Sequence, residues 1–491
     1  MIEQLPVLQV IVPLIAAPLC LVVRGAAITH LFAVGITWSC LGISVMLLLQ
    51  VLGGAPVSYE LGGWPPPIGI EYRVDVTNAF VLMIVSAIAS VVLVIGPGLR
   101  GHAIPSGREH LFYALFLLCL AGLLGVTITG DVFNVFVFLE ISSLAAYGLV
   151  SLGESRRALL AAFSYLIMGT IGGTFVLIGI GLMYLMTGTL NMADLAARIP
   201  ELRDTRTLQA AFAFLSVGIS IKLAVFPLHQ WLPNAYTYAP SVVSAFLAAT
   251  ATKVAYYLLV RLCFSIFGAA FVFETLHLQT LLMPLSIAAM FIGAIAAINQ
   301  TELKRLLAYS SVSQVGYMTL GLAFGSVTGL TGGLVHLFNH ALMKGGLFLV
   351  AACIVARLGS CEISKLRGLG RRMPLTSATF VVGGLGLIGV PATAGFISKW
   401  YLVLAALEDG GYLVAFAILA SSLLAAVYVW RVVEVAYFQE APADAPRGEA
   451  PASMLVPAWL LIGASVYFGI FTDWSAGIAR VAASQLLGVS P

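Results

Sequence analysis

Long apolar segments, separated by short polar ones, occur along the whole chain. Most are near or above the roughly 18 to 20 residues with which an α-helix crosses the hydrocarbon layer of a membrane. A transmembrane β-barrel would have shorter segments of alternating polarity, so the pattern predicts an all-α membrane protein of about 14 transmembrane helices. The helices are expected at residues 5–23, 27–52, 76–97, 111–129, 132–152, 158–187, 208–228, 241–267, 276–298, 305–325, 329–357, 375–407, 411–438 and 454–472.

Two polar segments are expected to lie outside the membrane. Residues 53–75, GGAPVSYELGGWPPPIGIEYRVD, are rich in Pro and Gly, which predicts an extracytoplasmic loop that forms a hairpin. Residues 439–453, QEAPADAPRGEAPAS, have the composition of a disordered or loosely held cytoplasmic linker.

The composition agrees with a membrane protein. Hydrophobic residues make up 60% of the chain and charged residues only 9%, which excludes a soluble enzyme. The net charge of +3 is spread over the loops without a basic, aromatic-rich patch, so nucleic acid is not an expected partner. The six cysteines form no CxxC pair and are expected as small buried hydrophobes.

The distribution of basic residues predicts the orientation. Of the 24 Lys and Arg residues, 20 lie in loops or at the ends of the predicted helices, and 14 of these fall on one side of the membrane. Cytoplasmic loops hold the excess of basic residues, so both termini are expected on the periplasmic or extracellular side of a bacterial inner membrane. The start, MIEQLPVLQVIV, is acidic rather than basic and is expected as a retained first helix, not a signal peptide.

Five ionisable residues lie deep inside predicted helices, where each charge costs at least a few kcal/mol. One such residue alone could be structural, with a long stem that reaches the interface or an ammonium that bonds backbone carbonyls. Five of them in the central helices instead favour a proton relay, because burial and neighbouring charges make a proton affinity adjustable. They are Glu140, Lys222, Lys253, Lys344 and Lys399.

Two groups of these residues suggest specific contacts. Glu140 is the only carboxylate in the middle of a predicted helix, and we expect it to exchange a proton with Lys222 if the two face each other. His336, His340 and Lys344 are four residues apart and share one helix face, along which histidines can pass protons. A zinc site at the two histidines is the alternative, but the sequence lacks the glutamate of HExxH and a third ligand, so no metal is expected.

Two of the predicted helices are interrupted. The seventh contains Pro227 shortly after Lys222, and the twelfth contains Pro391 shortly before Lys399. Prolines in matching helices of two halves are typical of a transport site built on inverted repeats. A weak similarity relates two segments, ESRRALLAAFSYLIMG at residue 154 and ELKRLLAYSSVSQVG at residue 302. We therefore expect two five-helix repeats, within 111–267 and 276–438. Helices 1 to 3 in 1–110 precede the repeats, and the linker and a last helix in 439–491 follow them.

Six motifs carry a resemblance to a known family: TGDVFNVFVFLE (129–140), MTGTLNMADLA (186–196), KLAVFPLHQWLPNAYTYAPSVVSAFLAATATK (222–253), NQTELKRLLAYSSVSQVGY (299–317), HLFNHALMKGGLFL (336–349) and GVPATAGFISKW (389–400). Together they resemble the antiporter-like subunits shared by respiratory complex I, membrane-bound hydrogenases and Mrp-type Na⁺/H⁺ antiporters. The first two motifs and the chain length most resemble the D-type branch of the Mrp antiporter subunits.

The resemblance implies a role for each buried ionisable residue. Two half-channels joined at mid-membrane would make one proton path, with Glu140 and Lys222 as the driving pair, Lys253 as the connecting lysine, His336, His340 and Lys344 as the central relay, and Lys399 as the exit. Some relatives have a glutamate at the last position, so Lys399 argues against that branch.

The leading functional hypothesis is therefore a proton-translocating subunit of a multisubunit Na⁺ or K⁺/H⁺ antiporter, with other membrane subunits as partners. The alternatives are a proton-pumping membrane subunit of a complex I-like or hydrogenase-type oxidoreductase and a membrane subunit of an inorganic-carbon uptake system. The chain has no dinucleotide fingerprint, iron–sulfur cysteine cluster or haem motif, so no cofactor of its own is expected.

Overall fold

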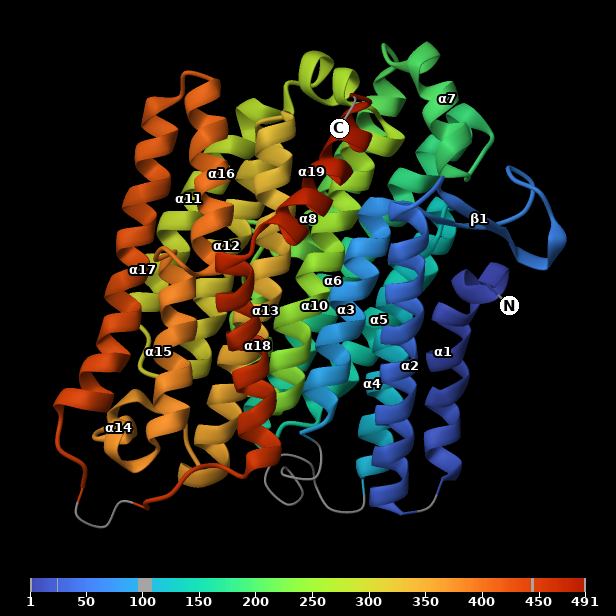
Figure 1. The fold of residues 1–491 in the computed structure, drawn as a ribbon. Helices are drawn as coiled ribbons and strands as arrows, with labels where there is room; N and C mark the ends of the chain where they lie inside the picture. The colour runs from blue at the N-terminus through green and yellow to red at the C-terminus, as the bar shows by residue number, and fades with distance from the viewer. Residues whose placement is uncertain (1, 24, 96–107, 443–445, 490–491) are drawn as a thin grey trace.

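The computed structural model describes residues 2–23, 25–95, 108–442 and 446–489, and most of them form one bundle of long helices (Figure 1). The α-helices are α1 (Leu5–Val22), α2 (Ala26–Leu52), α3 (Val76–Leu93), α4 (Glu109–Ile128), α5 (Val132–Ser151), α6 (Arg156–Thr187), α7 (Met192–Leu202), α8 (Arg206–Leu223), α9 (Trp231–Tyr238), α10 (Ser241–Val260), α11 (Leu278–Ile298), α12 (Leu303–Ala323), α13 (Val327–Leu358), α14 (Leu369–Arg372), α15 (Pro374–Ile388), α16 (Ala394–Glu408), α17 (Tyr412–Phe438), α18 (Ala452–Ile470) and α19 (Asp473–Leu487). Two π-helical turns, η4 (Arg261–Ile266) and η5 (Ala270–Thr275), and the 3₁₀ turns η1 (Ile2–Gln4), η2 (Leu61–Gly63) and η6 (Ile363–Leu366) complete the helical elements.

The two ends of the bundle differ. Strands β1 (Val57–Glu60) and β2 (Glu71–Val74) pair antiparallel and lie with α7 at one end, which we call the hairpin end (Figure 1). The opposite end, with α14 and the segment before α18, is called the linker end. The hairpin predicted in residues 53–75 is confirmed, and the hydroxyl of Tyr59 in β1 donates to Gln4 at the start of the chain, 2.8 Å away.

Each apolar segment of the predicted set overlaps with at least one helix, and eleven helices of the described residues are long and apolar enough to cross a membrane. The all-α membrane fold is thereby confirmed, while the count of about 14 crossings stays a prediction. Helices α7 and α19 were not expected from the sequence. Both carry many small or polar residues, so they lack the apolar run by which the other helices were found.

The seventh and twelfth predicted helices are broken, as their prolines indicated. Helix α8 ends at Leu223 because Ala224 has a left-handed φ of 61°, so the expected continuation to residue 228 was wrong. Helix α15 ends at Ile388, before Gly389 with φ of 87°, and α16 starts at Ala394. Lys222 therefore lies in the last turn of α8, next to the break.

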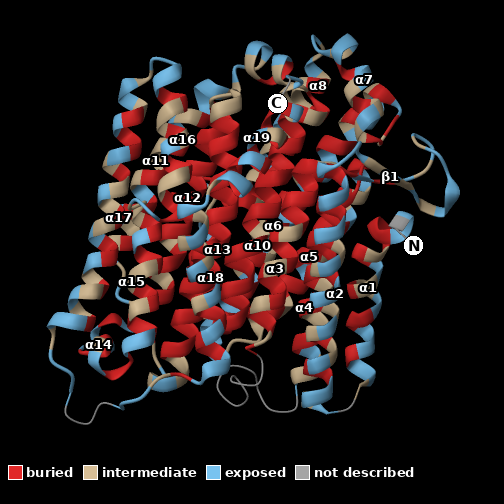
Figure 2. Cartoon of the chain, in the orientation of Figure 1, coloured by how far each residue is buried: buried red, intermediate tan, exposed pale blue. Residues whose placement is uncertain are grey.

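Helices α10, α12 and α13 form the centre of the bundle, and most of their residues are buried (Figure 2). Helices α2, α6 and α17 expose large apolar side chains along much of their length. Such a distribution is typical of peripheral helices that face lipid or partner subunits. The ionisable residues of α10 and α13 consequently lie far from the outer surface.

A matching backbone contact occurs twice in the chain, at opposite ends of the bundle. At the hairpin end, Asp131 pairs with Asn191, with Val132 N donating to Leu190 O over 2.9 Å. At the linker end, Glu302 pairs with Glu362, with Leu303 N donating to Cys361 O over 2.9 Å. The helices can be divided into two series, α4–α10 and α11–α17. In each series, one residue of the contact directly precedes the second helix, which is α5 in the first series and α12 in the second.

Part of the segment predicted as a disordered or loosely held linker, residues 439–453, is held in place by hydrogen bonds at residues 446–449, which corrects the expectation there, while residues 443–445 lie outside the described residues. The carboxylate of Glu449 accepts hydrogen bonds from the backbone N of Leu375 at 2.5 Å and the hydroxyl of Thr376 at 2.6 Å, at the start of α15. Arg372 Nε donates to the carbonyl of Pro446 at 3.1 Å. The polar composition that indicated disorder instead supplies a cap for a helix N-terminus, where a carboxylate is stabilised by the free backbone N–H groups.

Candidate functional site

Glu140 and Lys222 form an ion pair between α5 and α8. Lys222 Nζ lies 3.1 Å from Glu140 Oε1, and it also donates to the hydroxyl of Ser143 at 2.8 Å and to that of Tyr147 at 3.4 Å. The side chain of Lys222 is 8% exposed and that of Glu140 is 25% exposed. The structure therefore brings together the two residues that the sequence predicted as a pair.

The carboxylate of Glu140 lies near the outer face of the bundle. Val137 and Leu144, one turn away on either side along α5, are exposed. Glu140 also packs against Gly173 of α6, where an added Cβ would lie 2.3 Å from Oε1. A partly exposed carboxylate in the apolar surface of a membrane helix needs a covering group, because hydrocarbon cannot solvate it.

A small cavity lies beside Lys222, between α4, α5 and α10. It has a volume of about 40 Å³, and Ser143, Tyr165, Ala251 and Val254 are among its lining residues. A water needs on the order of 10 to 15 Å³ by this kind of measure, so the cavity has room for a few waters. It extends from the Lys222 ammonium to the face of α10 that bears Ala251 and Val254.

Lys253 is fully buried near the middle of α10. Its ammonium donates to the backbone carbonyl of Ala248 and, at 3.4 Å, to the hydroxyl of Thr252. Both partners are neutral. The positive charge of Lys253 is thus held without a carboxylate within 4.0 Å among the residues that the structure describes.

The central group lies on α13, where His336, His340 and Lys344 are fully buried at intervals of four residues. The two imidazole rings are stacked with centroids 5.9 Å apart. Lys344 Nζ donates to the hydroxyl of Ser310 at 2.5 Å and to the carbonyl of Leu307 at 2.8 Å. The predicted single face of titratable groups is therefore present.

A hydroxyl joins this group to the second broken helix. His336 Nδ1 lies 2.8 Å from Ser398 Oγ on α16, and the next residue is Lys399. Lys399 Nζ donates to the carbonyls of Leu387 and Ile388 at 3.0 and 2.9 Å. These carbonyls are free because α15 ends there, so Lys399 also has the structural role that the alternative interpretation assigned to a buried lysine.

Lys399 has two further contacts, with α17 and α12. It donates to the hydroxyl of Ser422 at 3.0 Å, and its Nζ lies 4.6 Å from the ring centroid of Tyr317. The face of a tyrosine ring attracts a cation electrostatically. These contacts stabilise the positive charge of Lys399, but none of them supplies a negative charge that balances it.

Several buried polar atoms of this region have no hydrogen-bond partner among the described protein groups. They are Nε2 of His336, both ring nitrogens of His340, both side-chain polar atoms of Gln314, and the hydroxyls of Tyr256 and Tyr428. An unsatisfied buried polar group costs about 1–3 kcal/mol. Polar atoms in such a group are usually satisfied by internal water.

Sequence reasoning missed the hydroxyl partners of the lysines. Ser143 and Tyr147 lie three and seven residues after Glu140, a spacing that places all three on one face of α5. The same rule relates Ser310, Gln314 and Tyr317 on α12. Ser143 and Tyr147 could thus have been found from their helical spacing to Glu140. Ser310 could not, because its role depends on the contact with Lys344 on another helix.

The sequence also offered the two histidines as an alternative zinc site. Within the part of the chain that the structure describes, no group of three or more His, Cys, Asp or Glu side chains is arranged to hold a metal ion. The stacked rings of His336 and His340 are bracketed by Ser398 and Lys344 instead.

Residues 129–425 match the protein family described as NADH:quinone oxidoreductase/Mrp antiporter, TM. The chain belongs to this family. The matched region of this oxidoreductase/antiporter family contains all seven predicted site residues, from Glu140 to Lys399. The resemblance that the motifs indicated is therefore confirmed.

The relatives of the chain include proteins named as oxidoreductase subunits and proteins named as antiporter subunits. A protein of Desulforudis audaxviator, named as the N subunit of an NADH-quinone oxidoreductase, is 44% identical, with 96% of this chain and 97% of the relative covered. A protein of Bacillus subtilis, named as the D subunit of a Na⁺/H⁺ antiporter, is 29% identical, with 98% and 97% covered. Among solved structures, a chain of the Mrp complex from a Dietzia species has a TM-score of 0.91 at 26% identity, with 99% of this chain and 97% of that chain covered.

Proposed function

We propose that the chain is the proton-carrying subunit of a multisubunit antiporter that exchanges a monovalent cation, Na⁺ or K⁺, for H⁺. The observation that carries the proposal is the series of titratable groups across the bundle, with the ion pair on α5 and α8 and the buried groups on α10, α13 and α16. The relative named as a Na⁺/H⁺ antiporter component and the likeness to a chain of an Mrp complex support the antiporter assignment.

The charge balance of the site favours proton transfer over a purely structural role. In the described residues, Lys253, Lys344 and Lys399 have no carboxylate within 4.0 Å, and only Lys222 is paired. Three uncompensated ammonium groups within one bundle repel one another at low dielectric. The bundle is more stable when some of the three are neutral, and a neutral amine can accept a proton from its neighbour.

The order of the groups defines a path. A proton shared by Glu140 and Lys222 passes through the small cavity to Lys253, then along the face of α13 that bears His340 and Lys344, and through His336 and Ser398 to Lys399. Water on the unpaired polar atoms bridges the steps that are too long for direct hydrogen bonds. The hydroxyl of Ser398 both donates and accepts, so it can relay a proton between His336 and Lys399.

The two series α4–α10 and α11–α17 serve in this proposal as inverted repeats, each with one half-channel. The paired contacts Asp131–Asn191 and Glu302–Glu362 at opposite ends of the bundle support it, as do the two broken helices at equivalent places. Two half-channels of opposite orientation start at opposite membrane faces and meet at the midplane. The basic residues favour the linker end as cytoplasmic, with both termini on the other side.

Partner subunits belong to the proposal. Glu140 is 25% exposed between exposed apolar residues of α5, which fits a neighbouring membrane subunit that covers the carboxylate. The exchanged cation is expected to use a path that includes such a partner.

A second candidate function is the proton-pumping membrane subunit of a redox complex. The 44% identical relative, which is named as part of an NADH-quinone oxidoreductase, favours it. In that case the same proton path would be driven by electron transfer in other subunits, and the chain would carry out no redox chemistry.

The deciding experiment expresses the complete operon in cells that lack Na⁺ export. Restored salt tolerance, with Na⁺- or K⁺-dependent proton movement in inverted membrane vesicles, is expected. Quinone- or ferredoxin-linked proton pumping without cation-dependent exchange would overturn the antiporter proposal in favour of the redox complex.

A further inference from the structure

A cavity of about 360 Å³ lies at the hairpin end, apart from the relay described above. Strand β2, the start of α3, helix α7, the end of α10 and the end of α19 line it. Its charged lining residues are Glu71, Arg73, Asp75 and Arg261. The path proposed above assigns no role to these residues.

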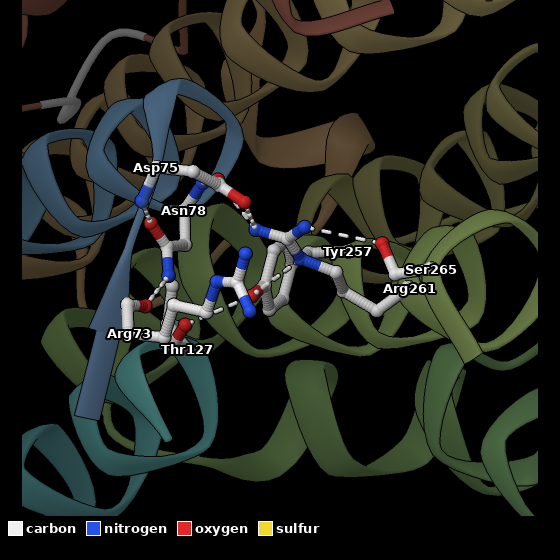
Figure 3. Close-up of polar contacts among 7 residues, drawn as sticks. All are labelled: Arg73, Asp75, Asn78, Thr127, Tyr257, Arg261 and Ser265. Carbon is white, nitrogen blue, oxygen red and sulfur yellow. Dashed lines mark hydrogen bonds and ion pairs between the residues drawn. The ribbon is translucent and has the colours of Figure 1, made fainter. Parts of the chain in front are cut away.

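Asp75 and Arg261, two of the residues that line this cavity, form an ion pair (Figure 3). Arg261 Nη2 lies 2.5 Å from both carboxylate oxygens of Asp75. Arg261 Nε donates to the hydroxyl of Tyr257 at 3.0 Å, and Nη1 donates to Ser265 Oγ at 3.1 Å. The Tyr257 hydroxyl in turn donates to the carbonyl of Thr127 at 2.9 Å. Each guanidinium nitrogen has a partner, so the arginine is fixed in one position.

Arg261 of this ion pair lies on the same side of its helix as Lys253, a residue of the proposed relay. Lys253, Tyr257 and Arg261 are four residues apart and share one stripe of the helix that runs from α10 into η4. At 1.5 Å of rise per residue, the backbone of Lys253 lies about 12 Å below that of Arg261. Tyr257 occupies the interval between the buried ammonium and the cavity.

The described conformation is closed. The Lys253 ammonium points away from the cavity, toward the carbonyl of Ala248, and Tyr257 is held by Thr127 and Arg261. The side chains of Arg261 and Asp75 are only 10% and 18% exposed. Proton exchange between Lys253 and the cavity therefore requires Arg261 and Tyr257 to change partners.

The local backbone has an unusual form at this place. Arg261 is the first residue of the π-helical turn η4, which directly continues α10. π-Helical turns are rare and occur frequently at functional sites. A wider turn places the guanidinium between the start of α3 and the end of α10, where it contacts Asp75 and Ser265.

A structural role for the same pair is the alternative. Asp75 caps α3, since its side chain accepts from Asn78 N at 3.1 Å, and Arg261 could merely tie this cap to α10. A tie of this kind would be needed for assembly but not for proton movement. The two roles therefore differ in what the loss of the charge does to an assembled complex.

We propose that the Asp75–Arg261 pair is the hairpin-end gate of a proton path between Lys253 and the cavity, a step that rests on the proposed function. For outward movement, the Lys253 ammonium gives one proton to the Tyr257 oxygen, directly or through water, as the Tyr257 hydroxyl releases its own proton to a carboxylate oxygen of Asp75. The neutral carboxylic acid no longer holds Arg261 by charge. Loss of the proton to water in the cavity restores the carboxylate and the ion pair, and Lys253 remains as a neutral amine.

The test uses the assembled complex in liposomes with an imposed pH gradient and choline as the only cation, so that no exchange is possible. Asp75→Asn keeps a good helix cap but removes the charge that holds Arg261. We expect its proton leak to exceed that of the wild type about tenfold, equivalent to ~1.4 kcal/mol of barrier. With choline alone, Tyr257→Phe is expected to show no leak and to abolish the leak when combined with Asp75→Asn. Once Na⁺ or K⁺ is added, it is expected to reduce cation-coupled proton movement by a similar factor.

The matched control is Asp194→Asn, which breaks another carboxylate–arginine pair at the hairpin end, the exposed 2.9 Å contact with Arg198 within α7. It is expected to leave both leak and exchange unchanged. Arg261→Lys keeps the charge but lacks the planar fork that bonds Tyr257 and Ser265, and it should also leak. It replaces Asp75→Asn if that variant does not assemble.

A wild-type leak in the assembled Asp75→Asn or Arg261→Lys complex would overturn the gate and leave the pair as a structural tie. A leak that persists in the double variant with Tyr257→Phe would overturn the path through Tyr257. Failure of the proposed function is a separate result, namely no cation-coupled proton movement by the wild type. The leak comparison needs only the imposed pH gradient.

Discussion

Lys222 reaches across from α8 to place its ammonium 3.1 Å from Oε1 of Glu140, in the last helical turn before a break. The break follows from Ala224, whose left-handed φ of 61° ends α8 at Leu223, one residue after Lys222. A lysine at the end of a helix can move with the loop that follows it. The distance between the two charges can therefore change without rearrangement of α5.

We expect Glu140→Ala and Lys222→Ala each to lower cation-coupled proton movement at least about a hundredfold, because each removes a group to which the proposed path assigns direct proton transfer. The amount of assembled complex should remain near that of the wild type. Inverted membrane vesicles with a pH-sensitive dye measure the transport, and native gels measure assembly. Glu201→Ala, on the exposed face of α7, is the control with an unchanged rate. A wild-type rate in either variant of the pair would remove these residues from the path.

The fold could largely be predicted because the membrane imposes one strong rule on the sequence. Apolar length identified the long helices, and Pro227 and Pro391 identified the two breaks. The same rule could not find α19, where Asp473, Arg480 and several small residues interrupt the apolar pattern. Helix α19 is nonetheless packed against α3 and α13, so its position depends on tertiary contacts that no local pattern encodes.

A second prediction concerns Gly173 of α6, against which the Glu140 carboxylate packs. A Cβ at this position would lie 2.3 Å from Glu140 Oε1, so Gly173→Ala must displace the carboxylate and lengthen its contact with Lys222. We expect a loss of exchange of roughly tenfold, which corresponds to ~1.4 kcal/mol. Gly181→Ala on the same helix has nothing within 4 Å of the new Cβ and should transport as the wild type does. Equal rates in both variants would show that the position of the carboxylate is not critical.

A third prediction concerns the hydroxyl between the central relay and Lys399. Ser398→Ala removes the partner of His336 Nδ1, 2.8 Å away, and with it the group that relays a proton from His336 to Lys399 in the proposed path. We expect the exchange rate to fall about tenfold while the thermal midpoint of the complex changes little, since a single hydrogen bond contributes only ~1 kcal/mol.

Ser286→Ala supplies the control for the third prediction. Ser286 is equally buried, and its hydroxyl bonds that of Thr319 at 2.7 Å between α11 and α12, away from the relay. Its exchange rate should stay at the wild-type level. If both serine variants lose transport equally, the effect of Ser398→Ala comes from packing and not from proton transfer.

The candidate site was predictable only in part. A charge inside an apolar segment is visible in the sequence, so Lys253, Lys344 and Lys399 could be found. The neutral groups that bond the site residues, such as Ser398 and Ser310, do not differ in type from the many serines of ordinary helices. Their role depends on contacts between helices distant in the sequence, as between Ser398 and His336.

A fourth prediction tests the segment between α17 and α18, which composition alone indicated to be loose. Glu449 accepts hydrogen bonds from Leu375 N and from the hydroxyl of Thr376, so it caps the first turn of α15 from 73 or 74 residues farther along the chain. Glu449→Ala should destabilise this end of the bundle by about 1 kcal/mol, the usual loss for a helix cap. We expect faster proteolytic cleavage within residues 439–453, with proton exchange retained because the relay lies away from this cap.

Glu440→Ala changes an exposed glutamate of the same segment that makes no such cap, and it should be cleaved at the wild-type rate. Unchanged cleavage of the Glu449 variant would mean that the contacts of Arg372 and Arg357 with Pro446 and Gly448 are sufficient to hold the segment.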